Sequence, residues 1–273
     1  MLNLKSAIYG FIIGDCLGVP FEFKKRGSFH CTDMVGHGTH NQPAGTWSDD
    51  TSMMLATLDS LKQSEDRVDV EDMRKRFKDW IYSGKYTADG KVFDYGITTK
   101  QALDLGVGLN DFYSNGNGSL MRILPLAFSD CTNDEIDKVS EITHAHPISK
   151  EACRIYVKIA RFLIVNKNLK GILENLECTE NFSKLKYLNI LREEQIKSSG
   201  YVVDTLEASL WCVLMTNSYK NAVLKAVNLG DDTDTIGAIT GGLAGVLYGY
   251  NNIPETWLEK LRNKDKIMEY INY

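Results

Sequence analysis

Residues 230–250 read GDDTDTIGAITGGLAGVLYGY, and this stretch decides the fold. The periodicity of its apolar residues over 235–249 predicts a buried helix. Each glycine in a helix interior costs on the order of 1 kcal/mol relative to alanine. Glycines nonetheless recur in this helix, at Gly237, Gly241, Gly242 and Gly245. Glycines spaced by four lie on one face of a helix, where a second backbone can approach closely.

A second helix with the same glycine spacing is predicted over residues 4–17, where Gly10, Gly14 and Gly18 recur. We therefore expect the two helices to pack closely in a crowded core. Helical periodicity also covers much of the remaining chain. The further predicted helices are 53–61, 70–82, 98–105, 119–128, 133–143, 149–166, 185–197, 205–215, 219–229 and 254–270. Strand-like alternation is almost absent, so the sequence predicts an all-α fold, organised as one compact domain over residues 1–273.

The composition excludes several classes of protein. With 43% hydrophobic and 25% charged residues, the chain is typical of soluble globular proteins. A net charge of -5, with only short basic patches, argues against a nucleic-acid groove. The six cysteines form no C-x-x-C pair, so we expect reduced thiols in a cytoplasmic monomer, without a zinc or disulfide framework. We also expect no membrane span, because no apolar run approaches the roughly 18 residues that a span requires.

Two acidic clusters stand at the entrances of predicted helices. GTWSDDT, at residues 45–51, precedes the helix 53–61, and GDDTDT, at residues 230–235, opens the glycine-rich helix. Helix capping is one interpretation of each cluster. Several carboxylates within a few residues repel one another, however, and a bound cation relieves that repulsion. The candidate ligands are all oxygen atoms, which suit Mg²⁺, Mn²⁺ or Ca²⁺ better than Zn²⁺. Two clusters that converge would make a two-metal centre.

The stretch NGNGSLMR, at residues 115–122, predicts a loop that enters a helix. Its glycines would let backbone amides approach a phosphate, although the pattern taken alone favours an ordinary turn and helix start. The spacing matches neither a Walker loop nor a dinucleotide fingerprint. Shortly after it comes THAHP, at residues 143–147. Two histidines alone favour a histidine satisfied in a turn over a metal site, with a polar contact to substrate as the functional alternative.

Taken together and in order, these motifs resemble the ADP-ribosylglycohydrolase family. The matching stretches are GDCLG at 14–18 with Glu22, WSDDT at 47–51, NGNGSLMR at 115–122, the segment around His144, GYVVDTL at 200–206 and LGDDTDTI at 229–236. They cover the chain from about residue 5 to residue 250. Ser48 stands where many relatives have threonine, and Asp231 where a second glycine is common. Neither departure removes a candidate ligand oxygen.

The resemblance implies an all-α orthogonal bundle with a binuclear Mg²⁺ site, at which Mn²⁺ is also possible. The implied metal ligands are Ser48, Asp49, Asp50, Asp232, Asp234 and Thr235. The implied catalytic residues are Glu22, Asp50, Asp232 and Asp94, the last from the stretch FDYG at 93–96. The implied contacts to the diphosphate and adenosine are Asn115, Gly116, Asn117, Gly118, Ser119, Met121 and His144.

The function implied by the resemblance is hydrolysis of the glycosidic bond of an ADP-ribosyl group, with ADP-ribosyl-arginine on a protein as the first choice of substrate. Serine-linked ADP-ribose, O-acetyl-ADP-ribose and a nucleic-acid adduct stay open, because selectivity for the leaving group lies in loops. Two rival functions are a metal-dependent phosphohydrolase and a non-catalytic ADP-ribose-binding relative. The absence of a His-Asp dipeptide argues against the first, and the retained acids argue against the second.

Overall fold

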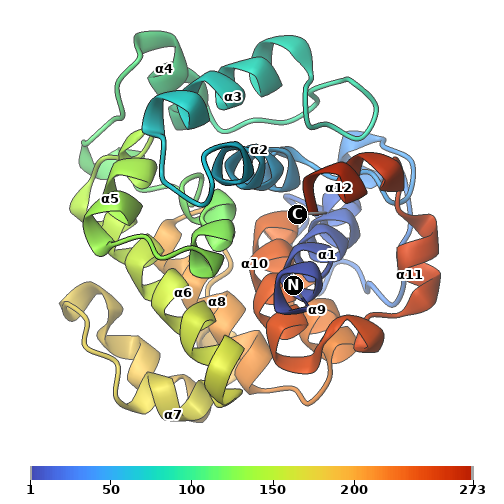
Figure 1. The fold of residues 1–273 in the computed structure, drawn as a ribbon. Coiled ribbons are helices and arrows are strands. Elements are labelled where there is room, and N and C mark those ends of the chain that lie inside the picture. The colour runs from blue at the N-terminus through green and yellow to red at the C-terminus, as the bar shows by residue number, and fades with distance from the viewer. Residues whose placement is uncertain (1, 272–273) are drawn as a thin grey trace.

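A computed structural model describes residues 2–271 and shows an all-helical molecule (Figure 1). The predicted all-α fold is confirmed, and no β-sheet forms among the described residues. The α-helices are α1 (Leu2–Gly18), α2 (Asp49–Gln63), α3 (Val70–Ser83), α4 (Ile97–Leu105), α5 (Asn133–Glu141), α6 (Pro147–Asn166), α7 (Leu169–Glu174), α8 (Val202–Leu214), α9 (Tyr219–Val227), α10 (Thr233–Tyr248), α11 (Glu255–Lys260) and α12 (Lys264–Ile271). Short 3₁₀ segments connect several of them.

The centre of the molecule is the antiparallel pair α1 and α10, around which the other helices pack (Figure 1). The two backbones meet at glycines, as the sequence predicts. A Cβ atom on Gly10 would lie 2.3 Å from the carbonyl oxygen of Gly241, and one on Gly14 would lie 2.0 Å from that of Gly237. At the end of α1, a Cβ on Gly18 would lie 2.3 Å from the Cα of Asp234. The close pairing therefore brings the C-terminal end of α1 against the acidic entrance of α10.

Three of the predicted helices are wrong in type or continuity. Residues 119–128 form two 3₁₀ segments, Leu120–Arg122 and Leu124–Phe128, because Pro125 cannot supply the backbone N–H that a continuous α-helix needs. Residues 185–197 fall in the 3₁₀ segments Glu180–Ile190 and Glu193–Gln195. The buried side chains of the first of these, Phe182, Leu185 and Leu188, are spaced by three, which matches three residues per turn.

The third error is the helix predicted over 254–270, which is divided into α11 and α12. The break lies at Asn263, whose φ of 46° is left-handed and incompatible with a continuing helix. Beside the break, the amide of Arg262 donates to the carbonyl oxygen of Gly45, 3.1 Å away. The short helix α7 was not predicted; it contains a glycine and is capped by the side chain of Asn168.

The first helix is long and apolar enough to be a candidate membrane span, which the sequence analysis did not expect. Residues Asn3–Phe21 reach a mean hydropathy of 1.3, which by length and composition is enough for a membrane span. The expectation that no apolar run approaches this length is therefore wrong, because apolar residues continue past Asp15. Within the fold, 89% of this window is buried. That burial is what the central helix of a packed core requires.

Candidate active site

A cavity of about 430 Å³ opens where the acidic clusters and the glycine-containing loop meet. The predicted site residues on its wall are Glu22, Asp49, Asp94, Gly116, Asn117, Gly118, Met121, His144, Asp232, Asp234 and Thr235. Its volume lies within the roughly 300 to 1,000 Å³ typical of small-molecule sites. Six separate stretches of the sequence therefore bring predicted site residues to one cavity.

The two acidic clusters contact each other directly beneath this wall. The hydroxyl of Thr235, at the start of α10, donates to Oδ2 of Asp50 at 3.3 Å. Ser48 caps α2, where its Oγ accepts from the amide of Asp50 and donates to the Asp50 carboxylate at 3.0 Å. Asp50 and Thr235 are 185 residues apart in the chain. The predicted convergence of the clusters is thus present in the fold.

Carboxylate oxygens gather here in two groups that share Asp234. In one group, oxygens of Asp15, Asp50 and Asp234 lie within 4.8 Å of one another. In the other, the same holds for Glu22, Asp232 and Asp234. Asp49 lines the cavity but joins neither group. Because Asp234 belongs to both groups, the two sets of carboxylate oxygens that could hold a metal ion lie next to each other.

The electrostatics of these groups favour a bound cation. Burial, followed by the charges of Glu22 and Asp50, raises the pKa of Asp234 well above its usual range. Burial, followed by the charge of Asp49, does the same to the pKa of Asp50. Within residues 2–271, no lysine or arginine forms an ion pair with Asp15, Asp49, Asp50, Asp232 or Asp234. The described residues therefore supply no lysine or arginine partner for these five carboxylates.

Two buried oxygen atoms point to the same conclusion. Oδ1 of Asp50 and Oδ1 of Asp232 are buried, and neither accepts a hydrogen bond from a described residue. A buried charged oxygen without a partner is costly. The all-oxygen donor set fits a hard divalent cation such as Mg²⁺. At the late cluster, Asp232 is the N-cap residue of α10 but its side chain caps no amide, whereas Oδ1 of Asp234 accepts from the amide of Thr235 at 3.0 Å.

Paired loops hold Glu22 beside the late cluster. The amide of Phe23 donates to the carbonyl oxygen of Asp231 at 2.7 Å, and the amide of Asp231 donates to that of Lys24 at 2.8 Å. Both Phe23 and Asp231 have positive φ angles, of 64° and 60°. This reciprocal pairing fixes the positions of Glu22 and Asp232, which are the chain neighbours of Phe23 and Asp231. It explains how Glu22, which lies just beyond α1, comes within reach of Asp232 and Asp234.

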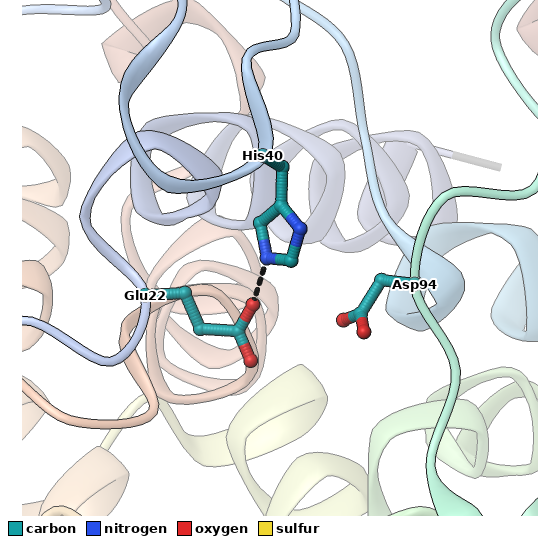
Figure 2. A group of neighbouring side chains, drawn as sticks. All are labelled: Glu22, His40 and Asp94. Atoms are coloured by element: carbon teal, nitrogen blue, oxygen red, sulfur yellow. Dashed lines mark hydrogen bonds and ion pairs between the residues drawn. The ribbon is translucent and has the colours of Figure 1, made fainter.

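Glu22 forms a smaller arrangement with His40 and Asp94 at the edge of the same cavity (Figure 2). Figure 2 shows the imidazole of His40 joined to the carboxylate of Glu22, with the carboxylate of Asp94 opposite them on a separate segment. Burial raises the pKa of Glu22 to about 7, although the hydrogen bond from His40 lowers it. The same hydrogen bond raises the pKa of His40. Glu22 can therefore hold or release a proton near neutral pH.

The loop at 115–122 is anchored from below by Arg122. This buried guanidinium donates to the carbonyl oxygen of Gly118 at 3.1 Å and to Oγ1 of Thr143 at 2.8 Å. The hydroxyl of Thr143 lies 2.8 Å from Nδ1 of His144, and donation to that nitrogen satisfies Thr143 as both acceptor and donor. Burial, then the charge of Arg122, lowers the pKa of His144 to about 3. The ring is therefore neutral, and its Nε2 lies beside Gly116 and Gly118 on the cavity wall.

With this geometry in view, comparison with known proteins decides the family. The sequence profile of the ADP-ribosylglycohydrolase family matches residues 3–273. The chain belongs to the ADP-ribosylglycohydrolase family. It is an enzyme that hydrolyses the glycosidic bond of ADP-ribosyl groups, and its family depends on metal ions.

Curated relatives and a solved structure agree with the profile. This glycohydrolase is 35% identical to ADP-ribosylarginine hydrolase Tri1 of Serratia proteamaculans, over 96% of its own length and 76% of the relative's. It is 31% identical to the ADP-ribosyl-[dinitrogen reductase] glycohydrolase of Rhodospirillum rubrum, over 95% and 90% of the two chains. A solved structure described as an ADP-ribosylglycohydrolase-related protein complex matches with a TM-score of 0.84 and 27% identity, over 99% of this chain and 95% of that one.

The structure adds two residues of this glycohydrolase that the sequence analysis did not select. Asp15 accepts hydrogen bonds from the amides of Ser48 and Thr51 and so fixes the entrance of α2. His40 orients Glu22. Asp15 lies within the quoted stretch GDCLG, and its charge in the middle of an apolar helix was an available signal. His40 lies in an irregular segment with no periodicity, and only the fold brings it to the site.

Two predicted substrate contacts of the glycohydrolase are not on the cavity wall. Asn115 is buried, and its side-chain oxygen accepts from Ser149 at 2.9 Å. Ser119 is buried beside Cys153. Both side chains hold the loop in place from behind, and we leave them out of the proposed substrate contacts.

Among the glycines of this loop, Gly116 is the one at which a side chain would reach the cavity without meeting a close neighbour in the fold. A Cβ on Gly118 would lie 2.8 Å from the His144 ring, whereas a Cβ on Gly116 would meet nothing closer than 3.6 Å. We expect Gly116→Ala to weaken ADP-ribose binding by about tenfold, because a methyl group at the wall displaces ligand atoms. Its melting temperature should stay near that of the parent protein. Calorimetric titration with ADP-ribose and thermal denaturation check both expectations, and unchanged affinity would contradict the first.

The raised carboxylate pKa values predict how stability depends on pH. Burial raises the pKa of Asp15 to about 6 and that of Glu22 to about 7, above ordinary values of about 3.9 and 4.3. Stabilisation from such groups is complete below the ordinary values and is lost as the pH rises through the raised ones. In a chelator, the melting temperature should therefore fall between pH 5 and pH 8, and added Mg²⁺ should reduce that fall. A chelated protein that is equally stable across this range would contradict the prediction.

Proposed function

We propose that this glycohydrolase hydrolyses ADP-ribosyl-arginine on proteins in a reaction that requires Mg²⁺. The observation that carries the proposal is the convergence of two acidic clusters on one cavity, with a buried, unpaired carboxylate oxygen in each cluster. The choice of arginine linkage is supported by the relatives, which are named as hydrolases of ADP-ribosyl-arginine and of ADP-ribosyl-dinitrogen reductase. Linkage to serine or to an acetyl group is the alternative.

The metal ligands that we propose are Ser48, Asp49, Asp50, Asp232, Asp234 and Thr235, and the structure suggests adding Asp15. Two ions fit the two carboxylate groups that share Asp234, and Mn²⁺ suits the same oxygen donors. When bound, such ions would orient the ribose hydroxyls and make a water molecule more acidic. The close packing of α1 against α10 brings Asp15 next to Asp234.

Glu22 and Asp94 are the proposed acid–base residues. Glu22 lines the cavity and is hydrogen-bonded by His40, so it is placed to accept a proton from an attacking water and return it to a leaving group. His40 keeps the Glu22 carboxylate turned into the cavity. Asp94 lies on the opposite side (Figure 2), where a carboxylate can pair with the guanidinium of a leaving arginine. Asp50 and Asp232 contribute by positioning the reacting ribose.

The loop residues Gly116, Asn117, Gly118 and Met121, with His144, are the proposed contacts to the rest of the nucleotide. The Nε2–H of neutral His144 is a donor suited to a phosphate or ribose oxygen. Asn117 donates to Asp232 at 2.7 Å and to Thr205 at 2.9 Å. It therefore ties the loop to the acidic cluster. Its role is to fix the distance between the phosphate contacts and the ribose contacts.

The proposal extends to the domain organisation, oligomeric state and compartment of the enzyme. We expect residues 1–273 to act as one domain, and the enzyme to work as a monomer in the cytoplasm. The six cysteines form no disulfide, which suits a reducing compartment. The substrate that we expect is an ADP-ribosylated protein, as the names of the relatives suggest.

A panel of linkages tests the proposed function. Purified enzyme is incubated in Mg²⁺ with ADP-ribosylarginine, a peptide carrying ADP-ribosylserine, and O-acetyl-ADP-ribose, and free ADP-ribose is measured by chromatography. We expect the arginine conjugate to have the highest kcat/KM. Release from the oxygen-linked substrates alone would replace arginine by an O-linked substrate. Release from none of the three would contradict the proposal.

A further inference from the structure

Exposed apolar side chains gather on one short segment beside the cavity. Six of the fourteen large apolar side chains that are exposed among the described residues fall within residues 95–113. They are Tyr95, Ile97, Leu105, Val107, Phe112 and Tyr113. Single exposed apolar residues are common on protein surfaces, but a concentration of them marks a surface that binds something. We call the surface formed by these six residues the patch.

The patch lies between two stretches that line the cavity. Residues 94–99 contribute to its wall on one side of the segment, and residues 116–118 contribute on the other. Ile97 belongs to both features, since it lines the cavity and is 75% exposed. The patch is therefore continuous with the cavity mouth.

Helix α4 sets the direction of the patch. Ile97 and Leu105 are spaced by eight residues and lie on one face of this helix, while Ala102 and Leu103 are buried on its other side. Figure 1 shows α4 at the periphery of the molecule beside α3. Val107 follows just after the end of the helix. The apolar surface thus runs outward from the cavity mouth along α4.

The cavity is too small to hold a substrate polypeptide, so the polypeptide must lie on the surface around the cavity mouth. At about 430 Å³ the cavity has room for a nucleotide but not for a folded or extended polypeptide. Asp94, the residue proposed to meet the leaving arginine, is followed directly by Tyr95 and Ile97 of the patch. A polypeptide that presents its modified arginine to Asp94 must therefore continue over the neighbouring surface, and the patch is the apolar part of that surface.

Charge around the patch is mixed. Residues 94–113 carry three aspartates and one lysine, and that lysine, Lys100, is paired with Asp104. Beside the patch, Arg74 of α3 donates to the carbonyl oxygen of Gly106 at 2.9 Å. Apolar contact is therefore the property by which the patch matches a polypeptide around its modified arginine.

We propose that the patch is a docking surface for the polypeptide that carries the ADP-ribosyl group, and that it selects apolar residues flanking the modified arginine. The inference rests on the proposed function, because it takes the leaving arginine to lie at Asp94. The distance along α4 from Ile97 to Leu105 is about 12 Å at a rise of 1.5 Å per residue. An extended peptide covers that distance in about four residues at roughly 3.3 Å each. The selected residues therefore lie about four positions from the arginine.

Matched peptides and variants test this. Two peptide sets carry a central ADP-ribosylated arginine, with leucine or serine four positions away on either side, and free ADP-ribosylarginine serves as a substrate without flanks. The double variant Leu105→Ser and Val107→Ser removes the outer part of the patch without changing a residue of the cavity wall. A control double variant, Val165→Ser and Ile190→Ser, removes two side chains of similar exposure, 78% and 71%, outside the patch.

We expect the parent protein and the control variant to prefer the leucine peptides by about tenfold in kcat/KM, and the Leu105/Val107 variant to lose this preference through a higher KM. Turnover of free ADP-ribosylarginine should be equal in all three proteins. Equal kcat/KM for leucine and serine peptides in the parent protein would overturn the docking surface while leaving the proposed function intact. A parent protein that fails on free ADP-ribosylarginine would overturn the proposed function first. A dimer that the Leu105/Val107 variant alone dissociates, with peptide preference unchanged, would assign the patch to self-association instead.

Discussion

Replacing Asp234 by asparagine is expected to lower turnover by two orders of magnitude or more, while making the metal-free protein more stable. Asp234 is the carboxylate shared by both oxygen groups, so asparagine weakens both cation positions at once. Even the loss of a side chain that only orients a metal ligand typically costs about 10- to 100-fold. In a chelator the effect reverses, because a buried charge next to Glu22 and Asp50 has been removed. Hydrolysis of ADP-ribosylarginine and thermal denaturation in a chelator are the two measurements.

The neighbouring substitution Asp231→Asn is the matched control. Asp231 belongs to the same motif but does not line the cavity. Its φ of 60° is left-handed, a conformation that asparagine adopts readily. This variant should keep the activity and stability of the parent protein. If Asp234→Asn behaved like Asp231→Asn in both measurements, Asp234 would be no more than a residue of the helix entrance.

The second large effect is expected at the contact of α1 with α10. Gly14→Ala would place a methyl group 2.0 Å from the carbonyl oxygen of Gly237, and the obstacle is backbone rather than a movable side chain. The helices must then separate, and overpacking in a tight core costs about 1–3 kcal/mol or more. The melting temperature should fall by roughly 5–10 °C. Activity should fall as well, because separation moves Asp15 away from Asp234.

Gly96→Ala provides the comparison for stability. A Cβ atom there would meet only the side chain of Thr99, at 3.6 Å. Its melting temperature should therefore stay close to that of the parent protein. A Gly14→Ala protein as stable as Gly96→Ala would mean that α1 and α10 are not packed backbone to backbone.

Local sequence carried the features that depend on local chemistry. Glycine spacing predicted the contact of α1 with α10, and hydroxyl and carboxylate residues at two helix entrances predicted the converging clusters. Periodicity alone could not separate an α-helix from a 3₁₀ segment at 119–128 and 180–190, because apolar spacings of three and four overlap in short stretches. The break at Asn263 depends on the packing of Gly45 against the chain, which no local pattern encodes.

The site could be predicted where its candidate ligands cluster in sequence. It could not be predicted where the fold brings in a single residue from a distant segment. The metal-site prediction followed from carboxylates that lie close together in sequence and repel one another, namely Asp49, Asp50, Asp232 and Asp234. His40 reaches Glu22 only because an irregular loop folds back over the end of α1. The separation between the cavity-facing Gly116 and the enclosed Gly118 likewise depends on the position of the His144 ring.

Dependence on a divalent cation is the most direct test of the account, because a buried oxygen of Asp50 and one of Asp232 have no partner among the described residues. ADP-ribose release from ADP-ribosylarginine is measured in protein freed of divalent cations with a chelator, and again after Mg²⁺ is restored. The account predicts that release stops in the chelator and returns with Mg²⁺. Undiminished release in the chelated protein would contradict it.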